Sequence, residues 1–110
     1  LCQAEIILEK ISPAVENHPV VTAIVRQTAK RLFPDATLDE NYQTMASEDM
    51  AFFLQEIPGC YSLIGSANPE EGLAAKHHQP DFDFDEGAMT TAAALILEAV
   101  NTLLDPEFQF

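Results

Sequence analysis

One stretch governs how the rest of this chain is interpreted: His77-His78-Gln79-Pro80-Asp81-Phe82-Asp83-Phe84-Asp85-Glu86. In an extended segment, Phe82 and Phe84 would face one side and the alternating aspartates the other. Neutral imidazole is a common metal ligand, and a nearby carboxylate often fixes its tautomer. The stretch can therefore hold imidazole and carboxylate groups at a polar cleft. Alternatively, it is a solvated acidic loop that caps the following helix.

That following helix, over residues 88–104, is the clearest element in the sequence. Its apolar residues recur at helical spacing: Met89, Ala92, Ala93, Ile96, Val100, Leu103 and Leu104. Asp85-Glu86 would lie in its first turn, where carboxylates complement the helix dipole, and Asp105-Pro106 would end it. Its alanines predict close packing on a sheet.

The preceding residues alternate between strand and helix patterns. An apolar stripe predicts a helix over 20–33, with Asn17 as a candidate N-cap and Pro19 in the first turn. Ser47 is expected to cap a further short helix that starts at Met50. Strands are predicted over 4–11, 36–42 and 60–66. This order is typical of an α/β fold with a mixed or partly parallel sheet.

Composition excludes several classes of protein. The 110 residues carry 5 basic and 18 acidic side chains and a formal charge of −13, which repels nucleic acid. No apolar run is long enough for a membrane span. Cys2 and Cys60 form no disulfide framework, so we expect a reducing compartment, the cytoplasm. A first residue that is Leu1 rather than Met predicts a piece of a longer protein.

Three segments carry a resemblance to a known family. Residues 44–52, Thr-Met-Ala-Ser-Glu-Asp-Met-Ala-Phe, resemble the Met-Gly-Ser-Glu-Asp-Phe-Ala-Phe signature of zinc amidohydrolases. Pro58-Gly59-Cys60-Tyr61 with Ile64-Gly65 resembles their next strand. Residues 78–88 resemble their closing His-x-Pro motif and helix. The family contains N-acyl-amino-acid amidohydrolases, hippurate hydrolases and indoleacetyl-amino-acid hydrolases, and is related to aminoacylases and zinc carboxypeptidases.

The resemblance implies a hydrolase with two divalent metal ions, zinc or alternatively manganese or cobalt. It places the last metal ligand at His78, with one ring nitrogen toward the metal and the other held by Asp81, Asp83 or a carbonyl. His77 falls outside the motif and receives no role. Ser47 would lie near the active site, and Asp49 would be structural or support the substrate-binding residues. Ala46 replaces the family's usual glycine.

The family's other ligands and its general base are missing from the sequence. No His-x-Asp pattern occurs, and Glu70-Glu71 follows Ser47, in the wrong order for the family's Glu-Glu pair, so it is interpreted as a loop. Residues 17–110 are therefore expected to be the C-terminal part of a zinc-peptidase-like catalytic domain, with no catalytic residue of its own and no activity alone. Residues 1–16 would end the lid domain, which mediates dimerisation in the family.

Three functions stay open at this point. The first is an amidohydrolase acting on N-acyl amino acids or similar small amides, with the remainder of its catalytic domain as partner and a homodimer as the expected assembly. The second is a carboxypeptidase or dipeptidase of the same clan. The third is a non-catalytic acidic module that pairs with another protein.

Overall fold

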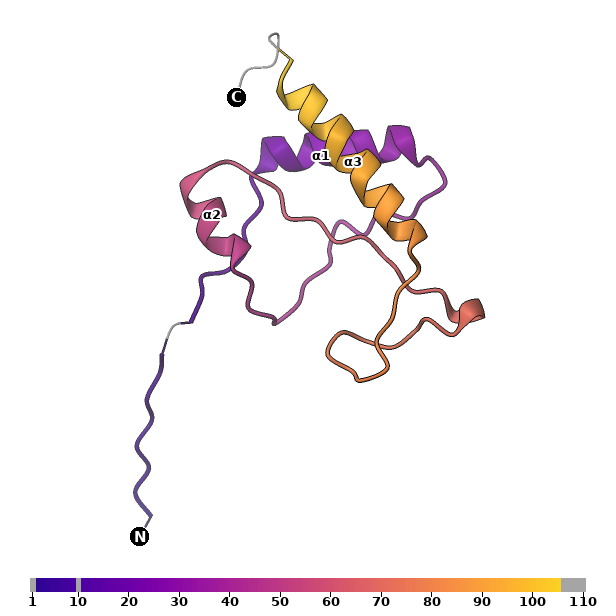
Figure 1. Cartoon of the computed structure of the whole chain (residues 1–110). Helices are drawn as coiled ribbons and strands as arrows, with labels where there is room; N and C mark the ends of the chain where they lie inside the picture. Colours follow the sequence, from indigo (N-terminus) through magenta and orange to yellow (C-terminus); the bar gives the residue numbers. More distant parts are fainter. Residues whose placement is uncertain (1, 10, 106–110) are drawn as a thin grey trace.

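The computed structural model describes residues 2–9 and 11–105. Within these residues the chain forms three α-helices and one short 3-10 helix: α1 (Pro19–Leu32), α2 (Met50–Glu56), η1 (Pro69–Glu71) and α3 (Gly87–Leu103). Figure 1 shows α1 and α3 crossing each other, with α2 to one side and long irregular segments between the helices. The helices predicted over 20–33 and 88–104 are confirmed, each with its ends displaced by one residue.

The core of the described residues lies where α1 meets α3. Its buried residues are small or β-branched on α1, and a leucine and an alanine face them from α3: Val21, Ile24, Thr28 and Ala29, with Leu95 and Ala99. Positions three and four apart share one face of a helix, so one stripe of each helix is covered. An ion pair between Arg31 and Glu98, 2.6 Å long, joins the two helices at the surface.

The start of α1 is fixed differently from the expectation. Pro19 is the first helical residue, as predicted, but His18 holds the N-cap position and the cap forms no side-chain hydrogen bond. The side chain of Asn17 is used elsewhere: its Nδ2 donates to the carbonyl of Tyr61 at 2.8 Å, and its Oδ1 accepts from the Tyr61 N–H at 2.7 Å. His18 N donates to the carbonyl of Gly59 at 2.9 Å. Asn17 and His18 thus satisfy backbone groups of Gly59 and Tyr61, in the segment after α2, that a neighbouring strand would otherwise satisfy.

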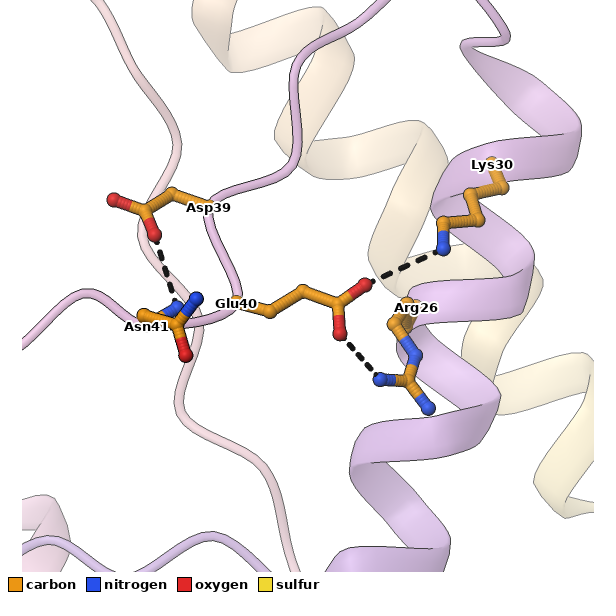
Figure 2. Close-up of polar contacts among 5 residues, drawn as sticks. All are labelled: Arg26, Lys30, Asp39, Glu40 and Asn41. Carbon is orange, nitrogen blue, oxygen red and sulfur yellow. Dashed lines mark hydrogen bonds and ion pairs between the residues drawn. The ribbon is translucent and has the colours of Figure 1, made fainter.

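The segment after α1 folds back onto it through one carboxylate. Glu40 accepts from Arg26 at 2.6 Å and from Lys30 at 3.3 Å, while Asp39 accepts from the backbone of Asn41 (Figure 2). These hydrogen bonds, from Arg26 first and Lys30 second, lower the pKa of Glu40. The basic side chains of α1 are therefore paired within the chain.

None of the three predicted strands forms a ladder in the residues that the structure describes. The β-pairing found there is one antiparallel bridge, between Asn68 and Leu73. Residues 2–9 run away from the helices in Figure 1, and Lys10 lies outside the described residues. A strand needs a neighbouring strand to satisfy its backbone groups, and within the described residues these segments have none, although Asn17 and Asp85 contact backbone groups of single residues within 60–66. The α/β sheet and the domain boundary after residue 16 stay predictions for a longer protein, as does the assignment of residues 106–110.

The described part of the chain is flat and open. Its radius of gyration is 18.1 Å, with extents of 66 × 42 × 19 Å, whereas a compact domain of this length has about 13 Å. Large apolar side chains remain exposed, including Leu97 (67%) on α3 and Phe53 (60%) on α2. No helix between residue 2 and residue 105 has the length and apolar character that crossing a membrane requires.

Candidate functional site

Two consecutive turns carry the candidate metal ligand. In the first, Gln79 N donates to the carbonyl of Lys76 at 3.2 Å, and Lys76 N donates back to Gln79 Oε1 at 2.6 Å. In the second, Phe82 N donates to the carbonyl of Gln79 at 3.0 Å. His78 occupies the third position of the first turn, where its φ is 66°. The turn thus holds His78 in the left-handed region, as a type II turn does at this position.

The neighbouring aromatic side chains form a short row of contacts. The ring of His77 meets that of Phe82 edge-on, with centroids 4.9 Å apart and an angle of 76°. Phe82 stacks on Phe84 at 6.3 Å, which agrees with the prediction that the two share a side. The rings of His77 and His78 lie at 71° to each other, 6.3 Å apart. His77, which had no role in the sequence interpretation, therefore packs against the loop that follows it.

The imidazole of His78 is exposed and forms no hydrogen bond with the described residues. The expected support from Asp81 or Asp83 is not found. Asp83 accepts instead from the N–H of Phe84 at 2.8 Å, because a carboxylate reaches the next backbone group more readily than a ring across the turn. Two open hollows of the surface lie near the end of α2, and His78 lines neither of them.

The donor chemistry of His78 fits one ligand position of a divalent metal ion. A solvent-facing imidazole with no competing partner is the form that binds such an ion. Among residues 2–9 and 11–105, no group of three or more His, Cys, Asp or Glu side chains comes together to hold a metal. A zinc site needs about three protein ligands. A metal site that used His78 would therefore need further ligands from outside the described residues.

Asp85 closes the base of the loop that carries His78. Its N–H donates to the carbonyl of Ser66 at 2.9 Å. Its carboxylate accepts from Asn68 Nδ2 at 2.9 Å and from the N–H of Gly87 at 2.8 Å. These hydrogen bonds, from Asn68 first and Gly87 second, lower the pKa of Asp85. The start of α3 is thereby tied to the segment before η1.

The second candidate segment precedes α2. Asp49 occupies the N-cap position of α2 and forms no side-chain cap, and Ser47 is exposed, so the predicted Ser47 cap is wrong. Glu48, which lies between them, makes the side-chain contacts at the start of α2: it accepts from Met50 N at 3.4 Å and from the Tyr61 hydroxyl at 3.0 Å. The hydrogen bond to Glu48, followed by burial, raises the pKa of Tyr61.

The structure does not bring the two candidate segments together. Figure 1 shows α2 on one side of the molecule and the loop before α3 on the other, and no hydrogen bond or ion pair joins them among the described residues. Asp85, which was predicted in the first turn of the last helix, lies just before α3, and its role there has a local signal, because Asp-x-Gly is a common turn pattern. The pairs Asn17–Tyr61 and Glu48–Tyr61 have none.

The sequence matches Peptidase family M20/M25/M40 over residues 2–102, and the chain belongs to this family. Peptidases of this family are generally metal-dependent. No solved structure matches the chain.

Curated relatives agree with this membership. The chain is 36% identical over 90 residues to "Putative amidohydrolase YhaA" of Bacillus subtilis, covering 82% of this chain and 23% of the relative. It is 31% identical over 99 residues to IAA-amino acid hydrolase ILR1-like 5 of Arabidopsis thaliana, covering 82% and 23%. It is 30% identical over 86 residues to thermostable carboxypeptidase 1 of Saccharolobus solfataricus, covering 78% and 21%. The chain thus spans less than a quarter of the length of these relatives.

Proposed function

We propose that this chain is the C-terminal part of a metal-dependent hydrolase that cleaves the amide bond of N-acyl amino acids or similar small amides. The exposed imidazole of His78, which has no hydrogen-bond partner among the described residues, carries the proposal. The relatives supply the substrate class, because their names include an amidohydrolase, an IAA-amino acid hydrolase and the N-acetyl-L-cysteine deacetylase of Bacillus subtilis.

In this proposal His78 supplies one ligand to one of two divalent ions, zinc or alternatively manganese or cobalt. A bound ion of this kind supplies Lewis acidity toward the scissile carbonyl. Ser47 and Asp49 are proposed to contact the substrate or to support residues that do, because both are exposed beside α2.

The partner that completes the protein is, in this proposal, the remainder of the same catalytic domain. The exposed apolar side chains of α2 and α3 would pack against it, because a helix that is apolar on several sides is normally buried. Residues 1–16 would belong to a lid domain that forms a homodimer. The free thiols of Cys2 and Cys60 are compatible with the cytoplasm.

A second candidate is a carboxypeptidase of the same family. It is favoured by the 30% identity to the two thermostable carboxypeptidases of Saccharolobus solfataricus. Peptide and N-acyl amino acid substrates share the scissile amide. Comparing turnover of an N-acyl amino acid with that of a peptide bearing a free C-terminus distinguishes the two.

The test uses the complete reading frame that contains this chain, with His78→Ala and the matched control His77→Ala. We expect His78→Ala to lose bound metal and to lower hydrolysis of N-acyl amino acids by about 100-fold or more, because one metal loses a ligand. His77→Ala removes ring contacts with Phe82 and His78 but no proposed metal ligand, and should stay close to the parent. Metal content by elemental analysis and turnover are measured for both. Equal effects of the two substitutions, or full activity in His78→Ala, would contradict the assignment.

A further inference from the structure

The backbone of His78 is held in an unusual conformation. Among the described residues, His78 is the one non-glycine residue with a positive φ, at 66°. Residues other than glycine, asparagine and aspartate adopt this region at a cost, and it is populated where surrounding contacts enforce it. The contacts that enforce it here are those of the residue that follows.

Gln79 makes three hydrogen bonds that close both turns around His78. Its N–H donates to the carbonyl of Lys76 at 3.2 Å, and its carbonyl accepts from Phe82 N at 3.0 Å. Its side-chain Oε1 accepts from Lys76 N at 2.6 Å, the shortest of the three. Pro80 occupies the second position of the later turn, which suits its fixed φ. The backbone conformation of His78 is therefore held on both sides by Gln79, through one side-chain and two backbone hydrogen bonds.

Apart from an edge contact with the ring of His77, the ring of His78 has no hydrogen-bonded support among the described residues. A metal-binding histidine is usually oriented by a carboxylate or carbonyl that accepts from its second ring nitrogen. The imidazole of His78 forms no such hydrogen bond with the residues in the described ranges, and Asp83 accepts from Phe84 N instead. The orientation of the ring in this part of the protein thus depends on the backbone, and the backbone depends on the turn.

We propose that Gln79 is a positioning residue for His78: its side-chain oxygen closes the turn that holds the His78 backbone in the left-handed region and thereby places the imidazole to bind metal. This rests on the proposed function, in which His78 is a metal ligand. The role belongs to the acceptor atom Oε1, because an aliphatic side chain of similar size cannot accept from Lys76 N.

The experiment compares Gln79→Leu, which removes the acceptor, with Gln79→Glu, which keeps an acceptor oxygen at the same distance along the side chain. Gln27→Leu is the matched control, since Gln27 is exposed on α1. Zinc dissociation constants of the complete protein are measured by competition with a chelator, and the melting temperature of the metal-free protein is measured in parallel. We expect Gln79→Leu to weaken zinc binding about tenfold, with little change in the metal-free melting temperature. Gln79→Glu and Gln27→Leu should stay close to the parent.

Two results would overturn the proposal: parental zinc affinity in Gln79→Leu, or equal weakening in Gln79→Leu and Gln79→Glu. The variant His78→Ala distinguishes failure of the proposed function from failure of the role of Gln79. If His78→Ala leaves zinc affinity unchanged, the proposed function fails, and the role of Gln79 fails with it. If His78→Ala weakens binding and Gln79→Leu does not, the positioning role alone fails.

Discussion

At the scale of single residues, Asp85 has the densest set of polar contacts near the candidate ligand. Its carboxylate accepts from Asn68 and from Gly87 N, and its own N–H donates to Ser66. Both acceptor contacts favour the ionised form, so the pKa of Asp85 in the folded chain lies below its ordinary value of 3.8. The contribution of Asp85 to stability must therefore depend on pH.

The sign of this dependence follows from the direction of the pKa shift. The contribution is fully present above the unfolded pKa and is lost as the pH falls through the lower, folded pKa. We expect Asp85→Ala to lower the free energy of unfolding by a constant amount between pH 5 and pH 7, and by a decreasing amount below about pH 4. Urea unfolding of the parent and the variant across this range measures the difference.

Asp83→Ala is the control for that series, because the Asp83 carboxylate accepts from the adjacent N–H of Phe84 and joins no distant segment. Its effect should be smaller than that of Asp85→Ala at neutral pH. A destabilisation by Asp85→Ala that is the same at pH 3 as at pH 7 would show that the carboxylate charge is not what holds Asn68 and Gly87.

At the scale of secondary-structure elements, the pair α1–α3 holds most of the buried residues, and the covered and exposed sides of α3 should respond differently to truncation of a side chain. Leu95 is 6% exposed at the contact with α1, whereas Leu97 is 67% exposed on another side of the same helix. In the 110-residue chain, Leu95→Ala is expected to lower the free energy of unfolding by about 2–4 kcal/mol. Leu97→Ala removes the same atoms from a solvated position and should change it by less than about 0.5 kcal/mol.

Chemical denaturation monitored by circular dichroism checks both variants. Similar losses for Leu95→Ala and Leu97→Ala would mean that α3 is covered on both sides in the isolated chain. In the complete protein, by contrast, Leu97→Ala should clearly lower the free energy of unfolding, because the proposed partner region would cover that side of α3.

The helices could be predicted because their signals are local. The stripe over 20–33 and the stripe over 88–104 contain their own periodicity, and Pro19 and Asp105 mark positions next to their ends. The strands predicted over 4–11, 36–42 and 60–66 are a different case, since a strand exists only with a neighbour. Their apolar pattern indicates burial, and the residues that would bury them are not among those described.

The residues of the candidate site likewise differ in whether a local sequence pattern indicates their role. The sequence pointed to His78 through a motif, and the structure adds that its ring is exposed on a turn with a positive φ. The sequence could not indicate that Gln79 closes that turn, because glutamine at this position has no strong turn preference. Nor could it reveal that Asn17 pairs with Tyr61, which lies 44 residues away and shares no local pattern with it.

At the scale of the whole molecule, the described residues leave much apolar surface in water. The radius of gyration of 18.1 Å and the exposed side chains of α2 and α3 describe an open arrangement. Large apolar side chains exposed in such number usually mark an interface. The formal charge of −13 opposes contact between copies at low ionic strength.

We therefore expect the isolated chain to bind a dye specific for apolar surface and to self-associate as salt is added. Light scattering should give a mass above the 12.1 kDa of one chain in 0.5 M salt, with less association in dilute buffer, because screening removes the repulsion. A compact monomer that binds no dye at either salt concentration would contradict both the open shape and the proposed partner surface. Adding the rest of the protein to the polypeptide should abolish dye binding.

The crossing of α1 with α3 also determines when this part of the protein can fold during its synthesis. Residues 33–86 separate the two helices, so α1 leaves the ribosome well before the helix that covers its apolar stripe. The pairing of Glu40 with Arg26 and Lys30 spans only 14 and 10 residues and can form at once. A helix forms within microseconds, whereas joining distant segments requires closure of the long loop. Until α3 has been translated, the apolar stripe of α1 lacks the helix that covers it, so this packing waits on a segment that begins only at Gly87.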